Sequence, residues 1–237
     1  MEFEQNLNME FRPEPNFYFD GGDLFYIELS IISFRNYISL VEKGFDAQIK
    51  NLAFKYNEHY KTIDDTDKFN SFLHNTSTQL MEIEKEFIQR FRKSIVIQIF
   101  SFLESELKSI CNCHAESTKS KYGVNDLKGY SDLDKIKKYL FNSMDIDLVK
   151  FEQWKFINNL RMVRNKIVHE NSTVKITNCD YASIKTFSKD YFLLDSQSPN
   201  SEFYTITLHS SNFLDDCLNI VESFIQDVMK NYSPKYN

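Results

Sequence analysis

The sequence predicts an all-α protein, an elongated antiparallel helical bundle with a small C-terminal β-hairpin insertion. Five glycines and four prolines in 237 residues leave few turns, so the elements should be long. Apolar residues recur every three or four positions over most of the chain, which is the period of an amphipathic helix. Alternating aromatic, threonine and isoleucine residues on both sides of a turn indicate the hairpin, at about residues 191–208.

Composition limits the class of protein. Charged residues at 26% and hydrophobic residues at 42% are ordinary for a soluble globule and exclude bulk disorder. The net charge of −6 argues against a broadly basic surface, so any contact with nucleic acid should be confined to one patch. The four cysteines lack disulfide-scaffold density, the amino terminus lacks a signal-peptide pattern, and the apolar run Ile95–Leu103 is too short for a bilayer. We therefore expect a cytoplasmic protein that does not contact a membrane.

The first two thirds of the chain should consist of an arm and long helices. Residues 1–21 are expected to be an extended arm, because Pro13 and Pro15 block a helix there. Gly21, Gly22 and Asp23 are expected to mark a break and an N-cap before the first helix. Residues 22–237 are expected to form a single helical domain. The apolar period predicts helices over residues 24–62, 69–115, 131–143 and 148–169. Ser131 should cap the third helix, and Ile95–Leu103 of the second should be the most buried part of the bundle.

The pattern changes after residue 170. Residues 171–180 are polar and are expected to form a loop, and residues 181–189 fit no single element. Residues 191–194 and 203–208 provide the two strands of the predicted hairpin. A last helix follows Ser210 and Ser211, with an apolar stripe from Phe213 to Met229. The sequence contains no evident internal repeat or linker, so one domain is the simplest interpretation.

The end of the predicted helix 148–169 concentrates the polar side chains that could do chemistry. Asn165 and His169 are four residues apart and share a helical face, with Arg161 one turn earlier. Arg164 and His169 are five apart, which separates their side chains by roughly 140° on a regular helix. Either the helix ends near His169 and lets its side chain turn back, or a second copy supplies the missing partner across a two-fold interface.

These residue types suit phosphoryl transfer in RNA without a metal. Arginine offers a fixed fork of donors to a phosphate. Histidine titrates near neutral pH and can take or give a proton, and asparagine can hold the imidazole or a ribose hydroxyl in place. A base would remove the 2′-hydroxyl proton, and arginine would offset the charge that develops on the phosphate. The structural alternative is that Arg164 and His169 are ordinary surface side chains.

The order Arg164-Asn165-x-x-x-His169, late in an all-helical chain, resembles the Arg-x4–6-His motif of the HEPN superfamily. An earlier helix carries the run from Phe102 to Leu107, Phe-Leu-Glu-Ser-Glu-Leu, which is similar to a Phe-Leu-Glu-x-x-Leu run of that family. The HEPN-like core would span residues 70–232. The arm and the first helix are not covered by the resemblance.

The resemblance implies a homodimer in which two motifs meet in a cleft. Many HEPN proteins are metal-independent endoribonucleases of toxin–antitoxin, abortive-infection or other defence systems. It implies that Arg164 and His169 are catalytic, that Asn165 positions them, and that no cofactor or metal takes part. RNA would be the substrate, and a cognate antitoxin, for example a nucleotidyltransferase-type protein, would be a partner. Some relatives lack activity, so a non-catalytic helical module that binds a protein or nucleic acid is the alternative.

Glu104, Arg161 and Lys166 are the expected supporting residues. Glu104 lies on an apolar stripe, where an unpaired carboxylate is costly. It either pairs with Arg164 or Arg161, or orients His169, or the helix is rotated and Glu104 faces water. The sequence Cys111-x-Cys113-His114 contains metal-ligand residue types, but no second pair has zinc spacing, so we interpret these residues as structural.

Overall fold

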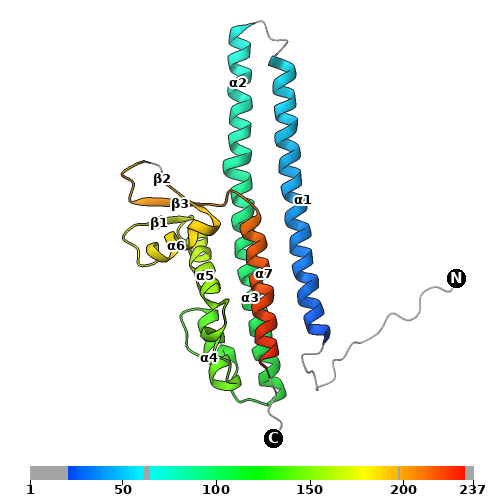
Figure 1. Ribbon diagram of the computed structural model, residues 1–237, viewed down its shortest axis with the longest axis vertical. Helices are drawn as coiled ribbons and strands as arrows, with labels where there is room; N and C mark the ends of the chain where they lie inside the picture. The colour runs from blue at the N-terminus through cyan, green and yellow to red at the C-terminus, as the bar shows by residue number, and fades with distance from the viewer. Residues whose placement is uncertain (1–20, 61–64, 197, 233–237) are drawn as a thin grey trace, which may run out of the picture.

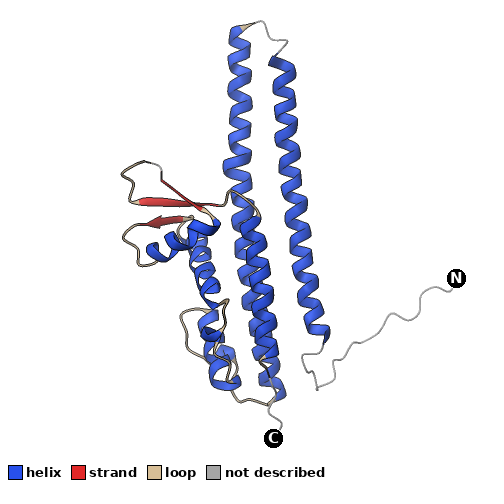
Figure 2. Cartoon of the chain, in the orientation of Figure 1, coloured by secondary structure: helices blue, strands red, loops and turns tan. Residues whose placement is uncertain are grey.

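The computed structural model describes residues 21–60, 65–196 and 198–232. This part of the chain is mostly helical and carries a small antiparallel sheet (Figure 2). The elements in order are α1 (Gly21–Tyr60), α2 (Thr66–Met81), the π-helical η1 (Glu82–Phe87), α3 (Ile88–Ser117), η2 (Val124–Asp126), α4 (Asp132–Met144), η3 (Leu148–Lys150), α5 (Trp154–His169), β1 (Thr173–Lys175), α6 (Tyr181–Tyr191), β2 (Leu193–Ser196), β3 (Phe203–Thr207) and α7 (Asn212–Lys230). Of the predicted arm at residues 1–21, residues 1–20 lie outside the described residues, and Gly21 belongs to α1.

The helices form an elongated bundle (Figure 1). Helix α1 runs antiparallel to α2 and α3, and the α1–α2 hairpin projects well beyond the remaining helices. Helices α3 and α7 lie side by side and pack on each other, while α5 packs against both of them on the side away from α1. Helix α5 runs antiparallel to both α3 and α7, so α7 runs in the same direction as α3 (Figure 1). The bundle is therefore antiparallel between most neighbours but parallel in its α3–α7 pair.

The predicted helix over residues 69–115 is confirmed as one continuous run from α2 through η1 to α3. Its centre is well buried, since Ile95, Val96, Ile99 and Leu103 have no exposed surface. It is not the most buried part of the bundle as predicted, because Gln98 and Ser101 are exposed and α7 is buried at least as fully. Side chains of this kind pack against α5 and α7 and exclude water from the middle of the bundle. This packing gives α5 a rigid base on which its polar end is held.

Helix α1 is apolar on two opposite faces. Its inner face buries Ile27, Ile31 and Ile38. Two hydrogen bonds of 2.7 Å from the Arg92 guanidinium to the Glu42 carboxylate tie it to α3. Its outer face exposes large apolar side chains, namely Phe25, Tyr26, Leu29, Ile32 and Leu40. The stretch Leu24–His59 is long and apolar enough to cross a membrane by length and composition, with a window of mean hydropathy 1.3 that is 17% buried.

Two predicted boundaries differ from the structure. Gly21, Gly22 and Asp23 lie within α1 instead of forming a break. The helix predicted from residue 148 begins only at Trp154, because the Asp147 carboxylate accepts the Val149 N–H at 3.1 Å and closes a separate 3-10 turn at η3. A preceding side chain that caps a short turn competes with the start of a longer helix.

The C-terminal region contains more regular structure than predicted. The antiparallel β2–β3 hairpin is confirmed, but residues 173–175 form a third strand where a loop was expected, in the order β1-β3-β2. Residues 181–191, which fitted no single element, form α6. The three residues of β1 are too few to show an alternating pattern, and their pairing with β3 depends on chain reversal after α5.

Candidate functional site

Arg164 lies on the side of α5 that faces α3. It is half-buried, and the centre of its guanidinium is 5.8 Å from the centroid of the Phe100 ring. Its Nη1 donates a hydrogen bond of 3.1 Å to Oδ1 of Asn165. Its Nε is buried and has no hydrogen-bond partner among the described residues. An arginine held on an aromatic face with one N–H unsatisfied retains the capacity to bind an anion.

Glu104 of α3 lies beside Arg164. It is half-buried and accepts a hydrogen bond from the backbone N–H of Leu133 at the start of α4. Burial is the main cause that raises the pKa of Glu104, and the charge of Asp132 adds to it, while Arg164, the Leu133 N–H and Arg161 lower it. The structure therefore favours the interpretation in which this carboxylate has charged partners over the one in which it simply faces water.

Arg161 connects α5 to α4. Its Nη1 lies 2.9 Å from Oδ1 of Asp134, and both side chains are half-buried. The predicted cap of α4 is confirmed, since the Ser131 hydroxyl accepts the Asp134 N–H at 3.2 Å. The Asp134 carboxylate pairs with Arg161, so this arginine holds two helices together one turn before Arg164.

Lys166 lies apart from Arg164, on another side of α5. It is 3% exposed, and its Nζ is 2.6 Å from Oε1 of Glu170 and 3.6 Å from Oδ2 of Asp180, the residue before α6. Asn171 and Ser172 follow with φ of 48° and 64°, a left-handed turn in which the Lys166 carbonyl accepts the N–H groups of Glu170 and Ser172. Lys166 thus joins the end of α5 to α6, and the structure does not bring it together with Arg164.

His169 is the last residue of α5 and is exposed. Within the described residues its imidazole makes no hydrogen bond. Helix α5 ends at His169, which is the condition of the first of the two arrangements considered from the sequence, but no hydrogen bond joins His169 to Arg164 in the described residues.

Two groups beside Arg164 were not predicted from the sequence. The Phe100 ring lies under the Arg164 guanidinium, and the Leu133 N–H donates a hydrogen bond to the Glu104 carboxylate. Phe100 could have been found, because it precedes Glu104 by one helical turn on the same stripe. Leu133 could not, because its contribution is a backbone group brought near by the packing of α4 on α3.

The Cys111–His114 region is a packed corner of the bundle. Cys111 is buried, which raises the pKa of its thiol to about 12. His114 Nδ1 lies 3.0 Å from the Tyr139 hydroxyl, and burial lowers the pKa of this imidazole. In the part of the chain that the structure describes, no group of three or more histidine, cysteine or carboxylate side chains is placed to hold a metal ion.

No protein-family model, curated protein or solved structure matches this chain. The structure establishes a mostly helical fold with a small antiparallel sheet. The resemblance to the HEPN superfamily therefore rests on the sequence alone, on the motif from Arg164 to His169 and on the run from Phe102 to Leu107.

Proposed function

We propose that this protein is a metal-independent endoribonuclease of the HEPN type that acts as a toxin or an anti-phage defence effector. The observation that carries the proposal is that two polar groups near the end of α5 have no hydrogen-bond partner in the described residues. Arg164 keeps a buried Nε–H without a partner although Phe100, Asn165 and Glu104 surround it. His169 stands exposed at the last position of the same helix.

The proposed reaction uses only groups that these residues supply. The neutral imidazole of His169 takes the proton of an RNA 2′-hydroxyl, and the 2′-oxygen attacks the adjacent phosphorus. The Arg164 guanidinium donates to the non-bridging phosphate oxygens as negative charge develops on them. The bond between phosphorus and the 5′-oxygen breaks, and that oxygen takes a proton from a general acid. The products are a 2′,3′-cyclic phosphate and a 5′-hydroxyl.

The general acid is proposed to be the protonated His169 of another copy of the chain. A regular helix separates Arg164 and His169 by roughly 140°, so one chain provides half of a site. A homodimer in which the same patch meets itself would complete it. In such a dimer the two His169 side chains lie within the span of one nucleotide, which a crystal structure would measure directly. A cognate antitoxin of the nucleotidyltransferase type is the proposed partner that restrains the enzyme in the cytoplasm.

The test is cleavage of a labelled RNA by purified protein in the presence of a chelator. Wild-type protein should cleave and leave the cyclic phosphate, and His169→Ala and Arg164→Ala should each lose activity by about 100-fold or more. Lys155→Ala, an exposed residue of the same helix, is the matched control and should retain activity. Circular dichroism should show that all variants are folded.

Two results would count against the proposal. Wild-type rates from His169→Ala protein would contradict the catalytic assignment. Folded wild-type protein that binds RNA or a protein partner but cleaves nothing would favour the non-catalytic helical module.

A further inference from the structure

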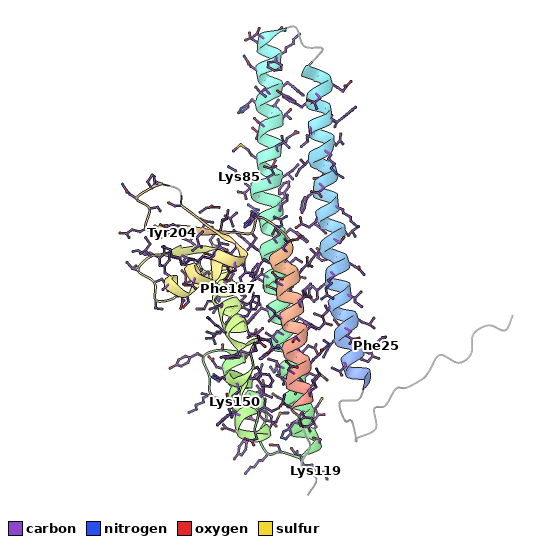
Figure 3. The ribbon with its side chains drawn as sticks, in the orientation of Figure 1. Phe25, Lys85, Lys119, Lys150, Phe187 and Tyr204 are labelled. Atoms are coloured by element: carbon purple, nitrogen blue, oxygen red, sulfur yellow. The ribbon has the colours of Figure 1, made fainter. Side chains whose placement is uncertain are left out.

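A cavity separate from the Arg164 patch lies between α6, the β2–β3 hairpin and the start of α7. Its volume is about 540 Å³, within the usual range of about 300–1,000 Å³ for small-molecule sites. Phe192 and Phe213, 2% and 1% exposed, lie at its base. Tyr204 and Phe187 mark this region of the molecule in Figure 3.

Phenylalanine and tyrosine side chains supply five of the fifteen residues that line the cavity. Tyr181 and Tyr204 face each other with ring centroids 5.7 Å apart, and Tyr191 lies 5.5 Å from Phe213. Aromatic side chains arranged in this way offer flat apolar surfaces on which a planar ring can stack. The wall therefore suits a ligand that contains an aromatic ring.

Two lysines stand at the rim. Lys185 and Lys189 are one helical turn apart on α6, and both are exposed. The Lys185 ammonium lies 5.5 Å from the centroid of the Tyr181 ring, which holds it above the wall. Across the described ranges neither lysine forms an ion pair with a carboxylate. Two ammonium groups at this spacing suit a phosphate.

Two carboxylates also line the cavity. Asp190 and Asp216 line the cavity near Tyr191. Burial raises the pKa of the Tyr191 hydroxyl, and the charges of Asp216 and Asp190 raise it further. A carboxylate at this position accepts hydrogen bonds, as the exocyclic amino group of adenine, cytosine or guanine would offer. A bare phosphate would gain nothing from the aromatic wall, and a purely apolar ligand would leave these charges without partners.

We infer that this cavity binds a nucleotide unit, with its base against Tyr181 and Tyr204 and its phosphate at Lys185 and Lys189. The unit could be a free mononucleotide or one nucleotide of a single-stranded RNA. The cavity begins at Tyr181, and the preceding Asp180 contacts Lys166, three residues before His169. An RNA strand at His169 could thus place a neighbouring nucleotide here. The RNA form of the inference rests on the proposed function, whereas the free-nucleotide form does not.

The experiment measures binding without cleavage. Adenosine 5′-monophosphate is titrated by calorimetry, and a short single-stranded 2′-O-methyl oligoribonucleotide, which lacks the attacking hydroxyl, by fluorescence anisotropy. Lys189→Glu and Tyr204→Ala should each weaken binding about tenfold or more, since stacking and phosphate contacts each contribute at that level. Lys43→Glu on α1 is the matched control, because Lys43 is also exposed. Lys189 is exposed, so its charge reversal should not disturb folding.

The outcomes separate the two sources of the ligand. Weaker binding of both probes by the variants supports a site for free nucleotides, and weaker binding of the oligonucleotide alone supports a subsite for RNA. The inference is overturned if wild-type protein binds neither probe, or if Lys189→Glu binds both as tightly as wild type does. That failure would leave the cleavage test on His169→Ala untouched, so the two proposals stand or fall separately.

Discussion

The polar groups near the end of α5 differ in how they are held. Lys166 is 3% exposed and its ammonium is held by Glu170 and Asp180. Arg164, two residues earlier, keeps an unsatisfied Nε–H, and His169, at the end of the helix, makes no hydrogen bond within the described residues. All three belong to six consecutive residues of one helix.

This difference separates polar residues that maintain the fold from those that are available to a ligand. A buried lysine with two carboxylate partners has little left to offer a substrate. A buried donor without a partner carries a cost of about 1–3 kcal/mol that a bound phosphate would remove. The comparison predicts that variants of Lys166 change stability and that variants of Arg164 and His169 change activity.

The largest stability effect is expected at Lys166. Lys166→Ala should lower the free energy of unfolding by about 1–3 kcal/mol, because it leaves a cavity and two carboxylates without their cation. Lys166→Met fills the space and should cost less than Lys166→Ala. Urea denaturation measures both, and RNA cleavage by Lys166→Met should stay near wild type. A stable Lys166→Met protein without activity would break the comparison.

A smaller, pH-dependent effect is expected at Glu104. Its folded-state pKa is raised, chiefly by burial, so the folded protein holds this proton more tightly than the unfolded chain does. Stability is therefore lost as the pH rises through the raised pKa. Glu104→Gln does not ionise, so its unfolding free energy relative to wild type should grow as the pH rises through the raised pKa of Glu104.

Glu116→Gln, an exposed position on the same helix, is the control and should show no such trend. We also expect Glu104→Gln to cleave RNA more slowly, because the carboxylate beside Arg164 is lost. A variant that is less stable than wild type across the whole pH range would mean that Arg164 and Arg161 outweigh burial at this carboxylate.

The smallest effect is expected at Arg161. Its ion pair with Asp134 is half-buried, and Arg161→Ala should lower the unfolding free energy by about 0.5–1 kcal/mol. The double variant with Asp134→Ala should cost little more, because the pair is then already lost. A loss of cleavage as large as that of Arg164→Ala would place Arg161 in the site itself.

The sequence predicted the long helices well, because each repeats its apolar stripe over several turns. The continuous helix through Ile95 to Leu103 and the cap at Ser131 are examples. It failed at β1, where three residues depend on pairing with β3, and at the start of α5, where Asp147 closes a separate turn. Such features depend on contacts that local periodicity does not contain.

The candidate site was predictable in part for the same reason. The proximity of Glu104 to Arg164 follows from two stripes that both face the core. Lys166, expected as a supporting residue, instead pairs with Asp180, which only the reversal at Asn171 and Ser172 brings near. The aromatic cavity was not predicted, because its wall combines α6 with strands whose pairing the sequence shows only in part.

The most direct measurement is RNA cleavage in a chelator by wild-type, Lys166→Met and His169→Ala proteins side by side. We expect wild-type and Lys166→Met proteins to cleave and leave a 2′,3′-cyclic phosphate, and His169→Ala protein to be inactive while folded. Equal cleavage by all three would contradict the claim that His169, and not Lys166, belongs to the catalytic site.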